Sequence, residues 1–280
     1  MHSPEPMAIQ APKGGDLVDR HRLSTRLWHW TNVITIVIML MSGLMIFNAH
    51  PRLYWGKYGA NPDYAWLQIG ATQGETGFLR VGSVTVDTTG VLGRWTESSG
   101  QVRNRAFPSW ATLPGSYNLA LARRWHLTFA WVFALGITAY LIRSLINRHL
   151  QRDLLPTAEQ ARPAHIWADI KHHAKLQFPK GEAARHYNIL QKFAYLSVLL
   201  VLIPGIILTG FTMSPSLNAT FPWLLDVFGG RQSARSLHFI FMLGIVAFVI
   251  VHLLMVVLAG PINEIRSMIT GRYRLPKEDK

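Results

Sequence analysis

The chain of 280 residues contains no cysteine. This absence excludes disulfide bonds, haem attachment through a Cys-x-x-Cys-His motif, and iron–sulfur clusters ligated by cysteine. Any redox centre in this protein would therefore be bound by histidine or methionine. Acidic residues are also scarce, because 15 Asp and Glu stand against 28 Lys and Arg and leave a formal net charge of +13.

Apolar sequence, in contrast, is abundant and makes up 49% of the chain. Four apolar runs are long enough to cross a hydrocarbon core about 30 Å thick. They cover residues 27–47, 124–146, 190–213 and 236–259. These runs predict an all-α membrane protein, a four-helix transmembrane bundle with tails at 1–26 and 260–280.

The basic residues flank the apolar runs, so we expect no nucleic-acid partner. The segment 147–189 is densely basic, and the positive-inside rule predicts that this segment and both termini are cytoplasmic. The first 20 residues are polar and lack the apolar region of a cleavable signal peptide. The first run is therefore expected to act as an uncleaved insertion signal.

The segment 48–122 would then lie outside, and it is rich in aromatic residues and glycine, unlike a disordered linker. We expect a folded extracytoplasmic cap, in which residues 79–86 form a strand or half a hairpin with turns at Gly90 and Gly93. Such a cap serves either as a structural lid or as a docking platform for a partner. On the inner side, residues 165–178 predict a short amphipathic helix at the membrane surface, and 214–235 predicts a short outer loop.

Two histidines of the last run, His238 and His252, are fourteen residues apart. This spacing is close to four helical turns and puts both on one face, roughly 21 Å apart along the axis. His29 lies near the cytoplasmic end of the first run and His126 near the outer end of the second. Depth alone therefore pairs His29 with His252 on the inner side and His126 with His238 on the outer side.

Two histidine pairs at two depths suit the axial ligands of two b-type haems. The alternative is that these histidines serve polar packing or proton relay. Zinc is disfavoured, because two histidines give too few ligands at either depth. Gly43, Gly136 and Gly244 would let a flat porphyrin pass between helices, although small residues also serve ordinary helix packing in membranes.

Several motifs carry a resemblance to a known family. They are RLWHW at His29, RRWHLTFAW at His126, YNILQKFAYL at the third run, and AGPINEIRSMITG after His252. In these motifs the chain resembles the di-haem cytochrome b subunits of respiratory formate dehydrogenase and Ni–Fe hydrogenase, and more broadly the bacterial cytochrome b561 type. The resemblance implies two haem b groups, with His29 and His252 on the inner iron and His126 and His238 on the outer iron. It also implies the bacterial inner membrane.

The resemblance further implies a quinone beside the inner haem. The residues that match the quinone segment of the relatives are Tyr187, Asn188, Gln191 and Lys192, with His186 next to them as a possible proton donor. Leu190 stands where the relatives have glycine. Asn188 also suits the N-cap of the third helix, which is the structural alternative.

The expected function is electron transfer between an extracytoplasmic redox partner docked on 48–122 and the quinone pool. The long outer loop resembles that of cytochromes associated with molybdopterin oxidoreductases of the sulfite-oxidase type. One alternative is a stand-alone superoxide:quinone oxidoreductase, and another is a non-redox scaffold or transporter. Four arginines, Arg26, Arg123, Arg124 and Arg235, would pair with haem propionates or extend to the membrane surface.

Overall fold

The computed structural model describes residues 15–73, 75–148, 155–174 and 189–275. The chain divides into two units, one formed by residues up to 34 together with 249–280, the other by residues 35–248. Each unit is described by itself.

Four helical segments of the described chain are long and apolar enough to cross a membrane. They are α1 (Leu23–Phe47), α2 (Leu119–Ile146), the composite segment Ile189–Met213 and α8 (Arg231–Ala259). They match the predicted runs, but three begin four or five residues earlier, because the residues that flank the apolar runs continue the helix. At α2, for example, the Asn118 side chain caps the helix by accepting from the amide of Leu121 at 2.9 Å.

The third segment is irregular. It consists of α4 (Ile189–Ser197), a π-helical turn (Val198–Leu202) and α5 (Ile203–Met213). The irregularity has a local cause, because Pro204 has no amide hydrogen to donate to the helical ladder. In a π-helical turn each amide bonds to the carbonyl five residues earlier instead of four. A carbonyl that would otherwise face the proline nitrogen can thus bond to another amide.

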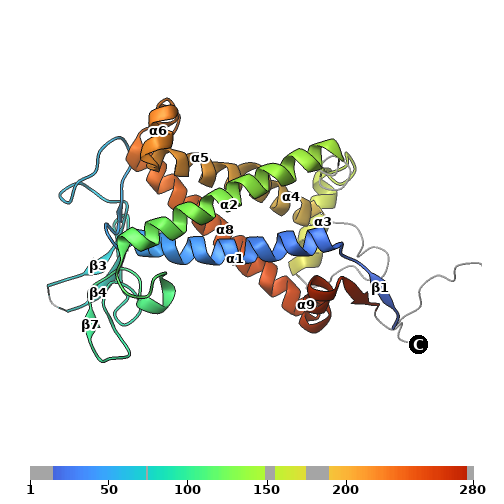
Figure 1. The fold of residues 1–280 in the computed structure, drawn as a ribbon, viewed down its shortest axis with the longest axis horizontal. Coiled ribbons are helices and arrows are strands. Elements are labelled where there is room, and N and C mark those ends of the chain that lie inside the picture. The colour runs from blue at the N-terminus through green and yellow to red at the C-terminus, as the bar shows by residue number, and fades with distance from the viewer. Residues whose placement is uncertain (1–14, 74, 149–154, 175–188, 276–280) are drawn as a thin grey trace, which may run out of the picture. The chain divides into compact units, whose positions relative to one another are not determined.

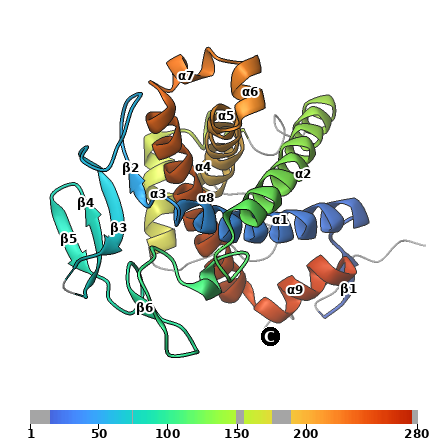
Figure 2. The ribbon, with the colours of Figure 1, turned by 60° about the vertical axis from the view of Figure 1, so that its left-hand side comes forward.

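The segment between α1 and α2 contains an antiparallel sheet in the order β2-β3-β4-β5. Its strands are β2 (Arg52–Leu53), β3 (Leu67–Ala71), β4 (Gly77–Val81) and β5 (Val84–Asp87), and a second small sheet pairs β6 (Trp95–Thr96) with β7 (Val102–Arg103). In Figure 1, β3 and β4 lie near the N-terminal end of α2, and Figure 2 shows strands β2, β3, β4 and β5 side by side.

Residues 79–86 span most of a complete hairpin, in which Val81 pairs with Val84. Gly82 adopts a φ of +60° in the turn between the two strands, a conformation that glycine accepts without steric cost. The run 79–86 therefore covers parts of two paired strands rather than the predicted strand or half hairpin, whereas the chain does turn at Gly90 and bend at Gly93 as predicted. Gly90 and Gly93 lie in the loop after β5, both with positive φ.

A hydrophobic cluster joins this sheet to two of the long helices. Phe47 at the end of α1 packs with Leu53 and Ile69 of the sheet, and Phe239 of α8 contacts the same cluster. The rings of Phe47 and Phe239 are stacked with centroids 5.0 Å apart. The sheet is thus packed directly against α8 at the residue next to His238.

The segments that the sequence assigns to loops contain further helices. The connection predicted at 214–235 contains two short helices, α6 (Pro215–Thr220) and α7 (Leu224–Val227), and the first turn of α8. The amphipathic helix predicted at 165–178 appears as α3 (Pro163–Ala174), and residues 175–178 lie outside the described chain.

The unit that contains both tails has structure of its own. β1 (Leu17–Asp19) pairs antiparallel with β8 (Arg272–Arg274). Between α8 and β8 lies α9 (Pro261–Thr270), which begins after Gly260 at a φ of +102°.

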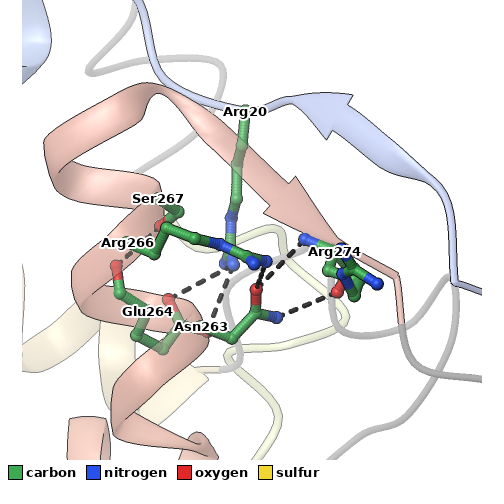
Figure 3. Close-up of polar contacts among 6 residues, drawn as sticks. All are labelled: Arg20, Asn263, Glu264, Arg266, Ser267 and Arg274. Atoms are coloured by element: carbon green, nitrogen blue, oxygen red, sulfur yellow. Dashed lines mark hydrogen bonds and ion pairs between the residues drawn. The ribbon is translucent and has the colours of Figure 1, made fainter.

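Side chains also hold the tails together (Figure 3). Arg20 forms an ion pair with Glu264 at 3.2 Å, and the Asn263 side chain bonds both the amide and the carbonyl of Arg274. The described parts of the two tails, for which the sequence predicted no secondary structure, are therefore joined by a two-stranded sheet and by side-chain contacts.

Candidate haem-binding histidine pairs

His126 of α2 and His238 of α8 lie together in the unit of residues 35–248. Their ring centroids are 6.3 Å apart with an interplanar angle of 61°. This is the pair that depth predicted for the outer side, and we call it the outer pair.

The ring separation can be compared with that of two ligands on one iron. A bond between a metal ion and an imidazole nitrogen is about 2.0–2.1 Å long, and a ring nitrogen lies roughly 1.1 Å from the centre of a five-membered ring with bonds of about 1.35 Å. Two imidazoles on opposite sides of one ion therefore have centres roughly 6.2 Å apart. The distance in the outer pair fits one metal ion between the rings.

Hydrogen bonds determine which nitrogen of each outer histidine is available. Nδ1 of His126 lies 3.1 Å from the carbonyl oxygen of Met39 and 3.2 Å from Oγ of Ser42. Nδ1 of His238 lies 3.1 Å from Oγ1 of Thr209. A carbonyl oxygen only accepts, so His126 carries its proton on Nδ1 and has the Nε2 lone pair free for a metal.

The outer pair lines a cavity of about 300 Å³. This volume falls at the lower end of the range of about 300–1,000 Å³ typical of small-molecule and cofactor sites. The walls are mostly apolar, and the charged residues that line the cavity are Arg123 and Arg235, each three residues before a histidine of the pair. An apolar slot with two cations suits a flat apolar ring system that carries carboxylates.

Arg235 is the more buried of the two arginines. Its guanidinium donates to the carbonyl oxygens of Arg52, at 3.0 Å, and of His50. It also lies over the ring of Phe47. Among the described residues, no acidic side chain forms an ion pair with it. Arg124, the fourth arginine of the sequence prediction, is exposed next to Arg123.

His29 of α1 and His252 of α8 lie together in the other unit and form the inner pair. Their ring centroids are 6.4 Å apart with an interplanar angle of 55°, again close to the separation of two ligands on one ion. Nδ1 of His29 is buried and has no hydrogen-bond partner within the described part of the chain. The separation of the two rings fits one metal ion between them, as in the outer pair.

The neighbours of His29 fasten the start of α1. The Trp30 indole donates to the carbonyl of Met268 at 3.1 Å, and the Arg26 guanidinium donates to the carbonyl of Ile269. Arg26 therefore makes one of its hydrogen bonds to the backbone of α9. Like Arg123 and Arg235, it lies three residues before a histidine.

Two of the glycines predicted to accommodate a porphyrin have different contacts. A Cβ on Gly43 would lie 3.3 Å from Cε1 of His126, so this glycine lets α2 approach α1 at the outer pair. A Cβ on Gly244 would lie 3.0 Å from Leu202, which is ordinary helix packing. Gly244 thus serves helix packing, and its role beside a porphyrin stays a prediction.

Sequence reasoning missed three residues at the outer pair, Ser42, Thr209 and Gly210. A Cβ on Gly210 would lie 3.5 Å from Cε1 of His238, which matches the position of Gly43 beside His126. One signal was present in the sequence, because a hydroxyl residue directly precedes glycine in the first and third apolar runs, at 42–43 and 209–210.

The proposed quinone segment is described in part. His186, Tyr187 and Asn188 lie outside the described residues. Gln191 and Lys192 lie in the first turn of α4. Lys192 is buried, and its ammonium donates to the carbonyl of Leu155 at 3.2 Å and to the Gln160 side chain at 3.0 Å. Its charge is therefore close to the segment that precedes α3.

Within the described chain, no group of three or more His, Asp or Glu side chains gathers as a metal site. The histidine pairs therefore have no further protein ligand of those types. This geometry suits a metal whose other ligands come from a macrocycle, as in haem, rather than zinc. The fold and the pairs together define a multi-pass membrane protein with paired histidines of the haem-ligand type.

The chain belongs to the prokaryotic cytochrome b561 family, whose sequence profile matches residues 20–271. The resemblance inferred from the motifs is therefore confirmed. Membership implies b-type haem, so the protein is a membrane b-type cytochrome of electron transfer.

Relatives of the chain are named as subunits of redox complexes. A protein of Azospira oryzae, named as a protein-methionine-sulfoxide reductase subunit, YedZ1, is 28% identical over 233 residues, 83% of this chain and 87% of the relative. A protein of Cupriavidus necator, named as a Ni/Fe-hydrogenase B-type cytochrome subunit, is 22% identical over 90% of this chain and 85% of its own length. One of Azotobacter vinelandii with the same name is 23% identical over 60% of this chain and 76% of its own length. No solved structure matches the chain.

Proposed function

We propose that the protein is a di-haem cytochrome b that transfers electrons between an extracytoplasmic redox enzyme and the quinone pool. One observation carries the proposal: two histidine pairs, His126 with His238 and His29 with His252, each have the ring separation of two ligands on one metal ion. A non-redox scaffold or transporter would have no need for that spacing at two places.

The residues of the outer pocket suit a haem in three respects. His126 and His238 would supply nitrogen ligands to the haem iron, and the apolar walls would exclude water. Arg123 and Arg235 would bind the propionates by charge-assisted hydrogen bonds, which are stronger than neutral ones. In the inner pair His29 and His252 are the ligands, and the arginine one turn before His29 is Arg26. Bound haem supplies reversible one-electron chemistry at both places.

The proposed docking surface is the segment between α1 and α2. Its described residues carry more arginine and lysine than aspartate and glutamate. A partner with an acidic surface around its redox centre would therefore be attracted to it. The more similar of the first two relatives is named as a reductase subunit, which favours a reductase partner and electron flow from quinol to that partner.

We place the quinone at the start of the third spanning segment, near Gln191 and Lys192. The basic segment 147–189 supports a cytoplasmic position for this end and for both termini, in the inner membrane. A buried ammonium at that depth can donate a hydrogen bond to a quinone carbonyl.

The test is a haem count on the purified membrane protein. A pyridine haemochrome assay should return two haem b per chain, and His252→Ala should lose one of them while His165→Ala, an exposed control, keeps both. Zero or one haem in the fully loaded wild type contradicts the proposal. Reduction of the haems by a quinol without any partner tests the quinone role, and reduction by superoxide without a partner would favour the stand-alone oxidoreductase instead.

A further inference from the structure

The two outer histidines are held in the same way by two different helices. His126 receives its contacts from α1, where Ser42 and the carbonyl of Met39 meet its Nδ1. His238 receives the matching contact from α5, where Oγ1 of Thr209 lies 3.1 Å from its Nδ1. Each hydroxyl is followed directly by a glycine that the imidazole ring approaches, Gly43 and Gly210.

The hydroxyl protons are already in use. Oγ of Ser42 donates to the carbonyl of Ile38, four residues earlier, at 2.6 Å. Oγ1 of Thr209 donates to the carbonyl of Gly205, also four residues earlier and also at 2.6 Å. With the proton directed to the helix backbone, the free lone pair of each oxygen faces the imidazole. Each hydroxyl therefore accepts from an Nδ1–H group.

This arrangement selects one tautomer for both histidines. With the proton on Nδ1, each Nε2 has a free lone pair, as a ligand to iron requires. An accepted hydrogen bond at Nδ1–H also increases the electron donation of the imidazole to a metal. Increased donation stabilises the oxidised form of the iron and lowers its reduction potential.

We propose that Ser42 and Thr209 are positioning residues for the outer haem. Thr209 fixes the tautomer and orientation of His238, Ser42 together with the Met39 carbonyl does so for His126, and both hydroxyls lower the potential of that haem. The inference rests on the proposed function, because it requires haem between His126 and His238. The inner pair differs on the α1 side, since Nδ1 of His29 has no partner among the residues that the structure describes. The effect should therefore be confined to one of two haems.

The experiment compares Ser42→Ala, Thr209→Val and their combination by redox titration and by electron paramagnetic resonance of the low-spin ferric haems. Thr212→Val is the matched control, because Thr212 is equally buried on α5 and donates its hydroxyl to the carbonyl of Thr209. Thr209→Ser tests rescue, because serine keeps the hydroxyl and loses only a methyl group.

The expected result is that the midpoint potential of one haem rises in each single variant and rises further in the combination. The resonance of the same haem shifts, while the other haem, the Thr212→Val protein and the Thr209→Ser protein keep wild-type values. Loss of one haem in Thr209→Val, with two retained in Thr209→Ser and Thr212→Val, supports the same role.

The proposal is overturned if the combined variant holds two haems with wild-type potentials and spectra. It is equally overturned if Thr209→Ser is shifted as far as Thr209→Val. A wild type without two haems contradicts the proposed function instead, so the two failures are distinguishable.

Discussion

The indole nitrogen of Trp66 donates a hydrogen bond of 2.9 Å to the hydroxyl of Ser236, two residues before His238. The same hydroxyl donates to the carbonyl of Tyr54 at 2.6 Å. One buried side chain of α8 thus joins two points of the sheet segment between α1 and α2. This segment is attached to the helix turn that carries His238, a proposed haem ligand.

The Ser236→Ala substitution removes both hydrogen bonds. It leaves the Trp66 N–H and the Tyr54 carbonyl without this partner, which costs about 1–3 kcal/mol per buried group. We expect a lower midpoint of thermal unfolding and faster loss of the outer haem, measured by the Soret band during dilution into excess apomyoglobin. Ser144→Ala is the control, because the Ser144 hydroxyl is buried without a hydrogen-bond partner in the described chain. Equal haem-loss rates in the two variants would contradict the idea that the Ser236 hydrogen bonds help to retain the outer haem.

Arg235 binds the carbonyl oxygens of His50 and Arg52 with two guanidinium nitrogens. Lysine keeps the charge but lacks the planar guanidinium group with several donors. Arg235→Lys should therefore keep at most one of the two hydrogen bonds and weaken the attachment of α8 to residues 50–52. We expect the haem count to fall from two towards one, with the inner haem retained. Arg124→Lys is the comparison, because Arg124 is exposed. A full haem count in Arg235→Lys would show that the guanidinium group is not required.

Gly230 combines a positive φ with a close contact. Its φ is +108°, and a Cβ would lie 2.7 Å from both the Gly56 carbonyl oxygen and the Lys57 Cα. Gly100 has a φ of +81° but nothing within 4 Å of a Cβ. Gly100→Ala should therefore cost only the backbone strain, about 1–3 kcal/mol. Gly230→Ala should cost clearly more, because the backbone at Gly56 must move.

The two alanine variants can be compared by detergent-solubilised yield and by thermal unfolding. A smaller effect at 230 than at 100 would mean that the Gly56 loop yields easily. That result would argue against tight attachment of this loop to the start of α8.

His50 provides a pH dependence outside the spanning helices. Burial lowers the pKa of His50 below its usual 6.5, and the charges of Arg235 and Arg52 lower it further. Between the folded pKa and 6.5 the unfolded chain binds more protons than the folded one, so stability falls as pH drops through that window. Below the folded pKa the loss is complete and constant.

The measurement is the apparent unfolding midpoint of wild type and His50→Gln between pH 7.5 and pH 5. Glutamine keeps a polar group near the Tyr54 hydroxyl, which His50 contacts through Nε2 at 3.2 Å. The midpoint of the variant should change less with pH than that of the wild type. Identical slopes would exclude His50 as the titrating group.

Much of the architecture is predictable from local pattern. Long apolar runs leave no alternative to spanning helices, because backbone groups in lipid must pair within their own segment. The outer segment was harder to predict, since short strands do not have a strong periodic signal. The prediction for 79–86 thus missed the turn at Gly82, which divides the run into two paired strands, although it placed the following turn at Gly90 correctly.

The sequence by itself determined the class of site: without cysteine, and with four histidines on apolar helices, a metal centre here uses imidazole ligands. It also determined which histidines share a depth, because helical rise converts residue number into distance. Only the tertiary structure decided which side chains form hydrogen bonds with the imidazole rings. The contacts of Ser42 with His126 and of Thr209 with His238 join residues far apart in the chain. Helix packing creates such contacts, and no local pattern encodes which helices meet.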